Sequence, residues 1–282
     1  MPLEDIMDTA RWMAFYRAIE SERPDALFHD PFARRLSGKR GEEIARGLPL
    51  RRQSTWIAAV RTRVFDEMIV QAVDDGVDTV LNLAAGLDTR PYRLALPSSL
   101  RWIEVDFPGI LSYKQEKLWE EQPVCFLERV PLDLANREAR KRLFTRVGAE
   151  GKLVLVVTEG FLLYMAPDQV AALACDLHAV PSFAWWLTGL ASPLMVKMLP
   201  QALKSYLARG AIQMQFAPEE GAAFFRDADW KVAEFRESRE EAHRLKREMP
   251  FGWLLQILVS LVPKSDQSTI GKRGGFLLLT RE

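Results

Sequence analysis

The spacing of apolar residues changes near residue 75, and this change predicts how the chain is organised. Before that point the spacing is helical. Residues 11–20 are amphipathic, Asp30 opens a further short helix, and Ser54 is expected to cap a helix over 54–73. Residues 38–52 contain glycine and several arginines and are predicted to be partly loop. We therefore expect a helical cap over the first 75 residues.

After residue 76 short apolar runs alternate with amphipathic helices, a pattern typical of a parallel sheet covered on both faces. The expected strands are 79–83, 101–105, 124–130, 152–157 and 183–187. The expected helices are 108–120, 137–147 with Asn136 as N-cap, and 168–180. The fold class is therefore predicted to be α/β, with a doubly wound and mostly parallel sheet.

The last ninety residues lose this alternation. Residues 194–216 are rich in Met and Leu and are predicted to be helical, followed by a short helix over 218–226. Strands are expected at 231–236 and 275–280, where they would form an antiparallel edge of the sheet. The apolar run 251–262 is shorter than the ~20 residues of a membrane span. We expect it to be a buried helix or the wall of a pocket.

Charge and composition narrow the classes of function. Lys and Arg together number 38, as do Asp and Glu, and this balance argues against a nucleic-acid partner. The acidic start Met1–Asp5 has no apolar signal region, so we expect a cytoplasmic protein with no membrane association. Cys125 and Cys175 are expected to be small buried hydrophobes. They lack the spacing of a metal site, and no metal is expected. The oligomeric state is not predicted.

Polar residues or glycine follow four consecutive predicted strands. Gly86 follows the first strand and Asp106 the second, Asp133 and Leu134 follow the third, and Glu159 follows the fourth. Ligands of open α/β sheets bind beyond the carboxyl ends of the strands, where these residues would meet. The sequence therefore predicts a ligand site at this edge.

The residues of the loop after the first predicted strand favour one class of ligand over another. Asp106 stands twenty positions after Gly86, as does the acid that binds a ribose in dinucleotide folds. NAD also needs a glycine-rich loop for its pyrophosphate, whereas 84–90 has one glycine, and Asp88 would repel phosphate. S-adenosylmethionine has a ribose and two cationic groups but no phosphate, so it fits better. The alternative is that Gly86 only makes a turn and Asp106 only caps the next helix.

Four further residues each have two interpretations. Arg61 falls on the apolar face of its helix, so it needs an anion: either a structural ion pair or a cofactor carboxylate. Asp133 and Leu134 suit an adenine ring or the start of a helix. Glu159 suits the cofactor ammonium or the acceptor pocket. His29 is the one histidine considered as a base, and the catalytic residue remains unknown.

Six segments occur in an order that resembles the leucine carboxyl methyltransferase superfamily, especially its bacterial branch of S-adenosylmethionine-dependent, polyketide-type O-methyltransferases. The resemblance covers roughly residues 5–190. The segments are Thr9-Ala10-Arg11 with Tyr16-Arg17-Ala18 and Glu20, Asp30–Ala33, Arg61-Thr62, Asn82–Arg90, Glu104–Pro108, and Thr158–Gly160 with Tyr164.

The resemblance implies a Rossmann-like methyltransferase fold, S-adenosylmethionine as cofactor and a small-molecule carboxylate or hydroxyl as acceptor. The last ninety residues match the family only in general plan. We expect a single domain over 1–282, with a cap (1–75), a cofactor-binding core (76–190), a lid (191–229) and C-terminal strands and helix (230–282). The implied cofactor contacts are Arg61 at the carboxylate, Ala85 and Gly86 in the loop, Asp106 at the ribose, Asp133 and Leu134 at the adenine, and Glu159 at the methionine end.

One residue departs from the family pattern. The family often has glycine where this chain has Ala84, whose methyl group stands where the backbone should approach the ligand. Two other functions therefore stay open. The chain could be an NAD-dependent oxidoreductase, which the missing glycines disfavour, or a catalytically idle binding module, for which Ala84 is the only sign.

Overall fold

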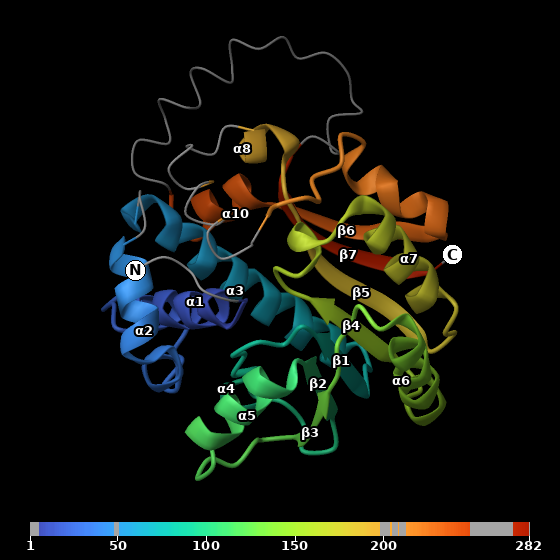
Figure 1. The fold of residues 1–282 in the computed structure, drawn as a ribbon, viewed down its shortest axis with the longest axis horizontal. Coiled ribbons are helices and arrows are strands. Elements are labelled where there is room, and N and C mark those ends of the chain that lie inside the picture. The colour runs from blue at the N-terminus through green and yellow to red at the C-terminus, as the bar shows by residue number, and fades with distance from the viewer. Residues whose placement is uncertain are drawn as a thin grey trace.

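A seven-stranded sheet in the order β3-β2-β1-β4-β5-β7-β6 forms the centre of the molecule (Figure 1). The computed structural model describes residues 6–47, 51–197, 204, 208, 213–248 and 273–281. The strands are β1 (Thr79–Leu83), β2 (Arg101–Asp106), β3 (Phe126–Pro131), β4 (Val154–Thr158), β5 (Phe183–Leu190), β6 (Trp230–Glu237) and β7 (Gly275–Arg281). The predicted α/β fold with a mostly parallel sheet is confirmed.

At the antiparallel edge of the sheet, β6 and β7 do not follow β5 in chain order. β1 to β5 pair in parallel, and β7 is inserted between β5 and β6 and runs antiparallel to both. The strand order reverses between β1 and β4, which neighbour each other in the sheet. This is the position where doubly wound sheets bind their ligands.

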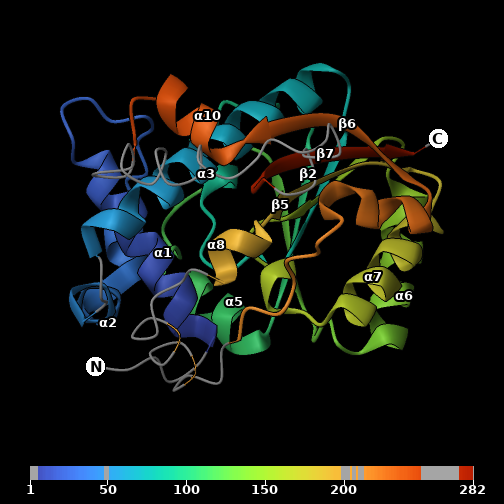
Figure 2. The ribbon, with the colours of Figure 1, turned by 90° about the horizontal axis from the view of Figure 1, so that it is seen from above.

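Helices cover the two faces of the sheet (Figure 2). The helices of the core and C-terminal part are α4 (Arg90–Arg93), α5 (Pro108–Lys117), α6 (Arg137–Glu150), α7 (Pro167–His178), α8 (Pro193–Lys197) and α10 (Ser238–Arg244), with 3₁₀ helices η1 (Leu162–Tyr164) and η2 (Gly221–Ala228). Alternate strand residues point to opposite faces. Leu81 therefore belongs to the core cluster that contains residues of α6, α7 and η2, and Val80 belongs to the cluster that contains residues of α3 (Arg51–Asp74) and α10.

The N-terminal cap consists of α1 (Ile6–Ser21), α2 (Ala33–Gly47) and α3. Glycine is required where α1 meets α2, because a Cβ on Gly41 would lie 2.6 Å from the carbonyl oxygen of Arg11. The predicted loop in 38–52 is wrong for most of its length. Residues 38–47 belong to α2, which only kinks at Gly38 (φ 57°), and α3 already starts at Arg51, so Ser54 lies within the helix rather than capping it.

Two predictions at the C-terminal end need correction or fall outside the described residues. The helix predicted over 194–216 is wrong at its end, because 213–216 have no regular structure; α8 forms its start and most of the remainder lies outside the described residues. The apolar run 251–262 also lies outside them. No helix in the described part of the chain is long and apolar enough to cross a membrane.

Candidate cofactor site

The loop after β1 is tied to the end of β2 by Asp106. The backbone N–H of Gly86 donates to Asp106 Oδ2 at 2.7 Å, and that of Phe107 donates to Oδ1 at 2.7 Å. Gly86 has φ +52°, a left-handed conformation that glycine adopts without strain. The carboxyl of Asp106 is buried, which raises its pKa, although the two N–H donors oppose that rise. Gly86 and Asp106, which the sequence predicts to lie at the same edge of the sheet, are therefore linked by a hydrogen bond.

Ala84, in the same loop, also adopts a left-handed conformation, with φ 53°. Such a conformation costs an alanine roughly 1–2 kcal/mol because its Cβ approaches the following carbonyl. Ala84 is therefore a point of backbone strain. Ala85, the next residue, has an ordinary φ and is buried.

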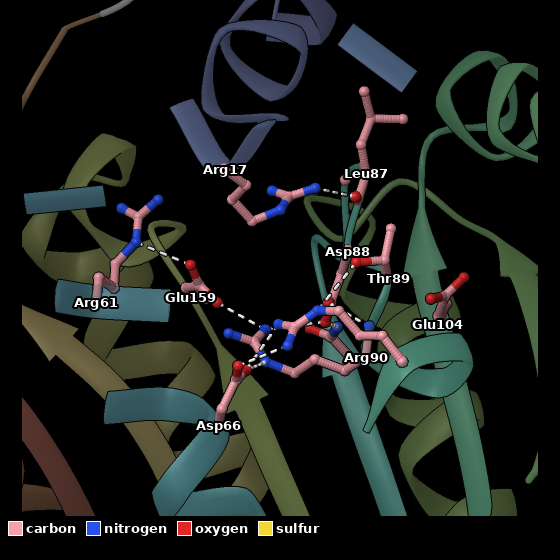
Figure 3. A network of polar contacts seen from close by, with 12 residues as sticks. Arg17, Arg61, Asp66, Leu87, Asp88, Thr89, Arg90, Glu104 and Glu159 are labelled. Atoms are coloured by element: carbon pink, nitrogen blue, oxygen red, sulfur yellow. Dashed lines mark hydrogen bonds and ion pairs between the residues drawn. The ribbon is translucent and has the colours of Figure 1, made fainter. Parts of the chain in front are cut away.

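Arg61 and Glu159 meet across the edge of the sheet (Figure 3). Arg61 on α3 donates from Nε to Glu159 Oε1 at 2.8 Å, just beyond the end of β4. The Nη1 and Nη2 groups of Arg61 have no hydrogen-bond partner among the described residues, and its side chain is 24% exposed. Gly160 makes room for this arginine, because a Cβ there would lie 3.2 Å from Arg61 Nη1.

The sequence analysis missed the residue at the centre of this network. Arg90 is 2% exposed and contacts Glu159 Oε2 at 2.7 Å and Asp88 Oδ2 at 3.0 Å through Nη1. Its Nε donates to Asp66 Oδ1 at 2.7 Å. Burial alone would raise the pKa of Glu159, but Arg90 and Arg61 outweigh burial and lower it. Glu159 is therefore ionised, and so is Asp88, whose pKa Arg90 also lowers against burial.

The cap contacts the same loop through Arg17, a second residue that the analysis of the sequence did not single out. Arg17 Nη2 donates to the carbonyl oxygen of Leu87 at 2.6 Å, and Nε donates to Asp30 Oδ2 at 2.9 Å. Thr89 Oγ1 donates to the same Asp30 oxygen at 2.7 Å. Helix α1 is thus fixed against the loop that contains Gly86.

The structure gives Asp133 and Leu134 local roles. Asp133 is exposed, and its Oδ1 accepts from the N–H of Ala135 at 2.9 Å, which forms the turn into α6. Leu134 is buried, and its carbonyl accepts from Arg140. The N-cap role predicted for Asn136 is confirmed by a bond from the N–H of Ala139. Contact of Asp133 and Leu134 with an adenine remains a prediction.

Several other predicted or neighbouring groups lie away from these contacts. His29 is exposed between the buried Phe28 and Asp30, so the structure gives it no support as a base. Arg11 lies over the ring of Tyr113, 4.6 Å from its centroid. Cavities of about 220 Å³ beside α1 and α10, and about 300 Å³ beside α5 and β3, include none of the residues that follow the parallel strands.

The chemistry of the strand-end groups fits S-adenosylmethionine. The open edge of Arg61 suits a carboxylate, the ionised Glu159 suits an ammonium group, and the oxygens of Asp106 suit ribose hydroxyls. The loop after β1 has one glycine and so lacks the pattern of a pyrophosphate loop, while its carboxylate, Asp88, is engaged by Asn82 and Arg90 and holds the loop in place. Fold and site together therefore define the class of Rossmann-like methyltransferases.

Comparison with known proteins narrows the class to a family. Residues 10–177 match the model of the leucine carboxyl methyltransferase family, and the chain belongs to this family. S-adenosylmethionine is the cofactor of these methyltransferases, which disfavours the NAD-dependent alternative.

Two relatives agree with this assignment, and a solved structure shares the fold. A protein of Streptomyces coelicolor is 34% identical over 58% of this chain, and one of Frankia alni is 37% identical over 58%; both are named as candidate S-adenosyl-L-methionine-dependent methyltransferases. The matches span 62% and 61% of those relatives' lengths. A crystal structure from Thermobifida fusca, titled as a candidate methyltransferase, shares the fold, with a TM-score of 0.55 at 17% identity over 99% of this chain and 96% of that one.

Proposed function

We propose that this chain transfers the methyl group of S-adenosylmethionine to an oxygen of a small-molecule acceptor. The observation that carries the proposal is the strand-end arrangement, in which the open edge of Arg61 lies beside the ionised Glu159 while Asp106 fixes the loop at Gly86. In this proposal Arg61 binds the cofactor carboxylate, Glu159 its ammonium and Asp106 its ribose. Ala85 and Gly86 line the loop, and Asp133 with Leu134 contacts the adenine.

Binding and alignment supply most of the catalysis in this proposal. The cofactor supplies an electrophilic methyl group when it is bound. Arg61 and Glu159 hold the two charged groups of its methionine end, and the cap excludes water by its contacts through Arg17. Correct alignment of two reactants contributes up to ~7–11 kcal/mol in favourable cases. A carboxylate acceptor is already ionised at pH 7 and needs no base.

An aromatic cluster next to Glu159 supports an apolar acceptor. Trp12 and Tyr16 from α1 pack with Tyr164 from η1 and with Met214. Tyr164 lies close enough to Arg61 that the arginine opposes the rise in the pKa of Tyr164 caused by burial. The cluster therefore lies between the cap and the proposed methionine end, where an acceptor needs to approach. Trp12 and Tyr16 are buried, whereas Tyr164 and Met214 are only partly buried. Because these last two offer mainly apolar surface, we infer that the acceptor carries its oxygen on an apolar body.

Calorimetric titration with S-adenosylmethionine, S-adenosylhomocysteine and NAD tests the cofactor assignment. We expect micromolar binding of both sulfur nucleotides, none of NAD, and loss of binding in Asp106→Ala. Asp74→Ala is the control and should bind as the wild type does, because Asp74 is the exposed last residue of α3 and precedes β1, at the edge of the sheet opposite the strand ends. Absence of binding by the wild type would remove the proposal and leave only the fold.

The predicted lid (191–229) has its own test. Leu194 and Met195 on α8 are exposed apolar side chains, about half accessible at 49% and 48%. If they cover the acceptor, Leu194→Asp should raise the KM for the acceptor while the affinity for S-adenosylhomocysteine stays unchanged. Val232→Asp, an exposed position on β6, serves as the control. An unchanged KM would exclude this part of α8 from the acceptor site.

A further inference from the structure

Arg90 connects more of the strand-end network than any residue named in the proposed site. Its Nη1 is shared by Glu159 Oε2 at 2.7 Å and Asp88 Oδ2 at 3.0 Å, and its Nε binds Asp66 at 2.7 Å (Figure 3). These carboxylates come from the loop after β4, the loop after β1 and helix α3. Arg90 thus joins three separate segments at one point.

The contacts of Glu159 show what Arg90 controls. Glu159 Oε2 is held by Arg90, and Oε1 accepts from Arg61 Nε, so both oxygens of the carboxylate are engaged. Only the Nε side of Arg61 faces Glu159, which leaves Nη1 and Nη2 open among the described residues. The orientation of Arg61 therefore depends on Glu159, and that of Glu159 depends on Arg90.

We propose that Arg90 is a positioning residue, which fixes the Glu159 carboxylate so that the open edge of Arg61 faces the anionic end of the cofactor. The inference rests on the proposed function, because it takes Arg61 and Glu159 as cofactor ligands. A guanidinium is required at position 90, since its planar fork donates in several fixed directions, whereas a lysine ammonium is a point charge.

The charges around Glu159 make this role measurable. Arg61 from α3 and Arg90 from α4 face it as cations, and Asp88 faces it as an anion. Tyr164 from η1 lies near Arg61 and stays neutral, because burial raises its pKa. Three arginines (61, 90 and 93) balance three carboxylates (66, 88 and 159) in this network. Among the described residues, removal of Arg90 leaves Glu159 with Arg61 as its only cationic partner beside the anionic Asp88, so the pKa of Glu159 should rise.

The test is the affinity for S-adenosylhomocysteine between pH 5 and pH 8 in Arg90→Gln and Arg90→Lys. Arg93→Gln is the matched control, because Arg93 is equally buried and pairs with Asp66 at 2.6 and 2.8 Å but does not contact Glu159. We expect the wild type and Arg93→Gln to bind almost independently of pH. Arg90→Gln should bind about tenfold more weakly at pH 8 and lose further affinity toward pH 5, as Glu159 becomes protonated.

Arg90→Lys retains the buried charge and keeps the test decisive if Arg90→Gln does not fold. It should also bind more weakly than the wild type, because it cannot hold Glu159 and Asp88 together. Wild-type affinity with a flat pH profile in a folded Arg90 variant would overturn the inference and reduce Arg90 to a structural residue. If the wild type itself does not bind S-adenosylhomocysteine, the proposed function fails instead.

Discussion

At the scale of single residues, Ala84 is an alanine held in the left-handed conformation in the loop after β1. Glycine would relieve the strain of roughly 1–2 kcal/mol but would lose about 0.5–1 kcal/mol through the greater freedom of the unfolded chain. We therefore expect Ala84→Gly to leave the free energy of unfolding unchanged or to raise it by up to about 1 kcal/mol. Ala85→Gly, whose φ is ordinary, should lower it by about 0.5–1 kcal/mol. Urea denaturation of the two variants gives the comparison, and equal losses would show that Ala84 carries no strain.

The two cysteines differ in a way that the sequence did not show. Cys125 is buried as predicted, and burial raises the pKa of its thiol to about 11, whereas Cys175 is exposed, contrary to the prediction. Because the thiolate is the reactive form, iodoacetamide at pH 8 should alkylate Cys175 in the folded protein and leave Cys125 unmodified. Mass spectrometry of the digested protein locates the adduct. Alkylation of both thiols in denaturant is the control, and equal rates in the folded protein would contradict the burial of Cys125.

At the scale of elements, the ion pair of Arg17 with Asp30 fixes α1 to the loop after β1. Burial would raise the pKa of Asp30, but Arg17 outweighs it and lowers the pKa. This carboxylate therefore contributes stability above its unfolded pKa of ~3.9, and the contribution is lost as the pH falls toward the lower folded value. Asp30→Asn should cost roughly 3 kcal/mol at pH 7, because it leaves Arg17 poorly compensated.

Denaturant titrations from pH 3 to pH 7 check this dependence. The free energy of unfolding should fall below about pH 4 in the wild type, and the fall should be shallower in Asp30→Asn. Asp25→Asn is the control, because the side chain of Asp25 is 61% exposed and its ion pairs contribute little. A variant curve parallel to that of the wild type would show that Asp30 does not contribute to the loss of stability in acid.

The central strands were predictable because they are buried on both faces. β1 is buried at all five positions, three of which are apolar, and its predicted bounds, 79–83, are confirmed. The helix α4 and the kink of α2 at Gly38 were missed, since arginine and glycine in a short segment also suit a loop. The position of β7 between β5 and β6 depends on pairing between distant segments, which no local pattern encodes.

The candidate site, like the fold, could be predicted only in part from the sequence. Gly86, Asp106 and Glu159 could be predicted as a group because they lie at or shortly after the carboxyl ends of strands, and parallel strands bring those positions to one edge. Arg90 was missed because its partners Asp66 and Glu159 lie far from it in the sequence. The available signal was an arginine in the segment that follows a fully buried strand. A cation buried at such a position needs an anionic partner.

At the scale of the whole molecule, β7 joins β5 and β6 into one sheet. Leu279 on β7 is fully buried and pairs with Val232 on β6, which is 41% exposed. Leu279→Ala should lower the free energy of unfolding by about 2–5 kcal/mol because it creates a cavity, and Val232→Ala should change it by less than about 0.5 kcal/mol. Guanidinium denaturation measures both. Similar small losses would show that β7 contributes little to the stability of the sheet.

The insertion of β7 also sets the order in which the sheet can be completed during synthesis. The ribosome makes β5 and then β6 before residues 275–281 exist, and β7 separates these two strands in the finished sheet. Until β7 emerges, the outer edge of β5 has unpaired backbone groups, and unpaired edges promote aggregation of nascent chains. Expression of this protein should therefore depend on chaperones that protect the nascent chain more than its final stability suggests.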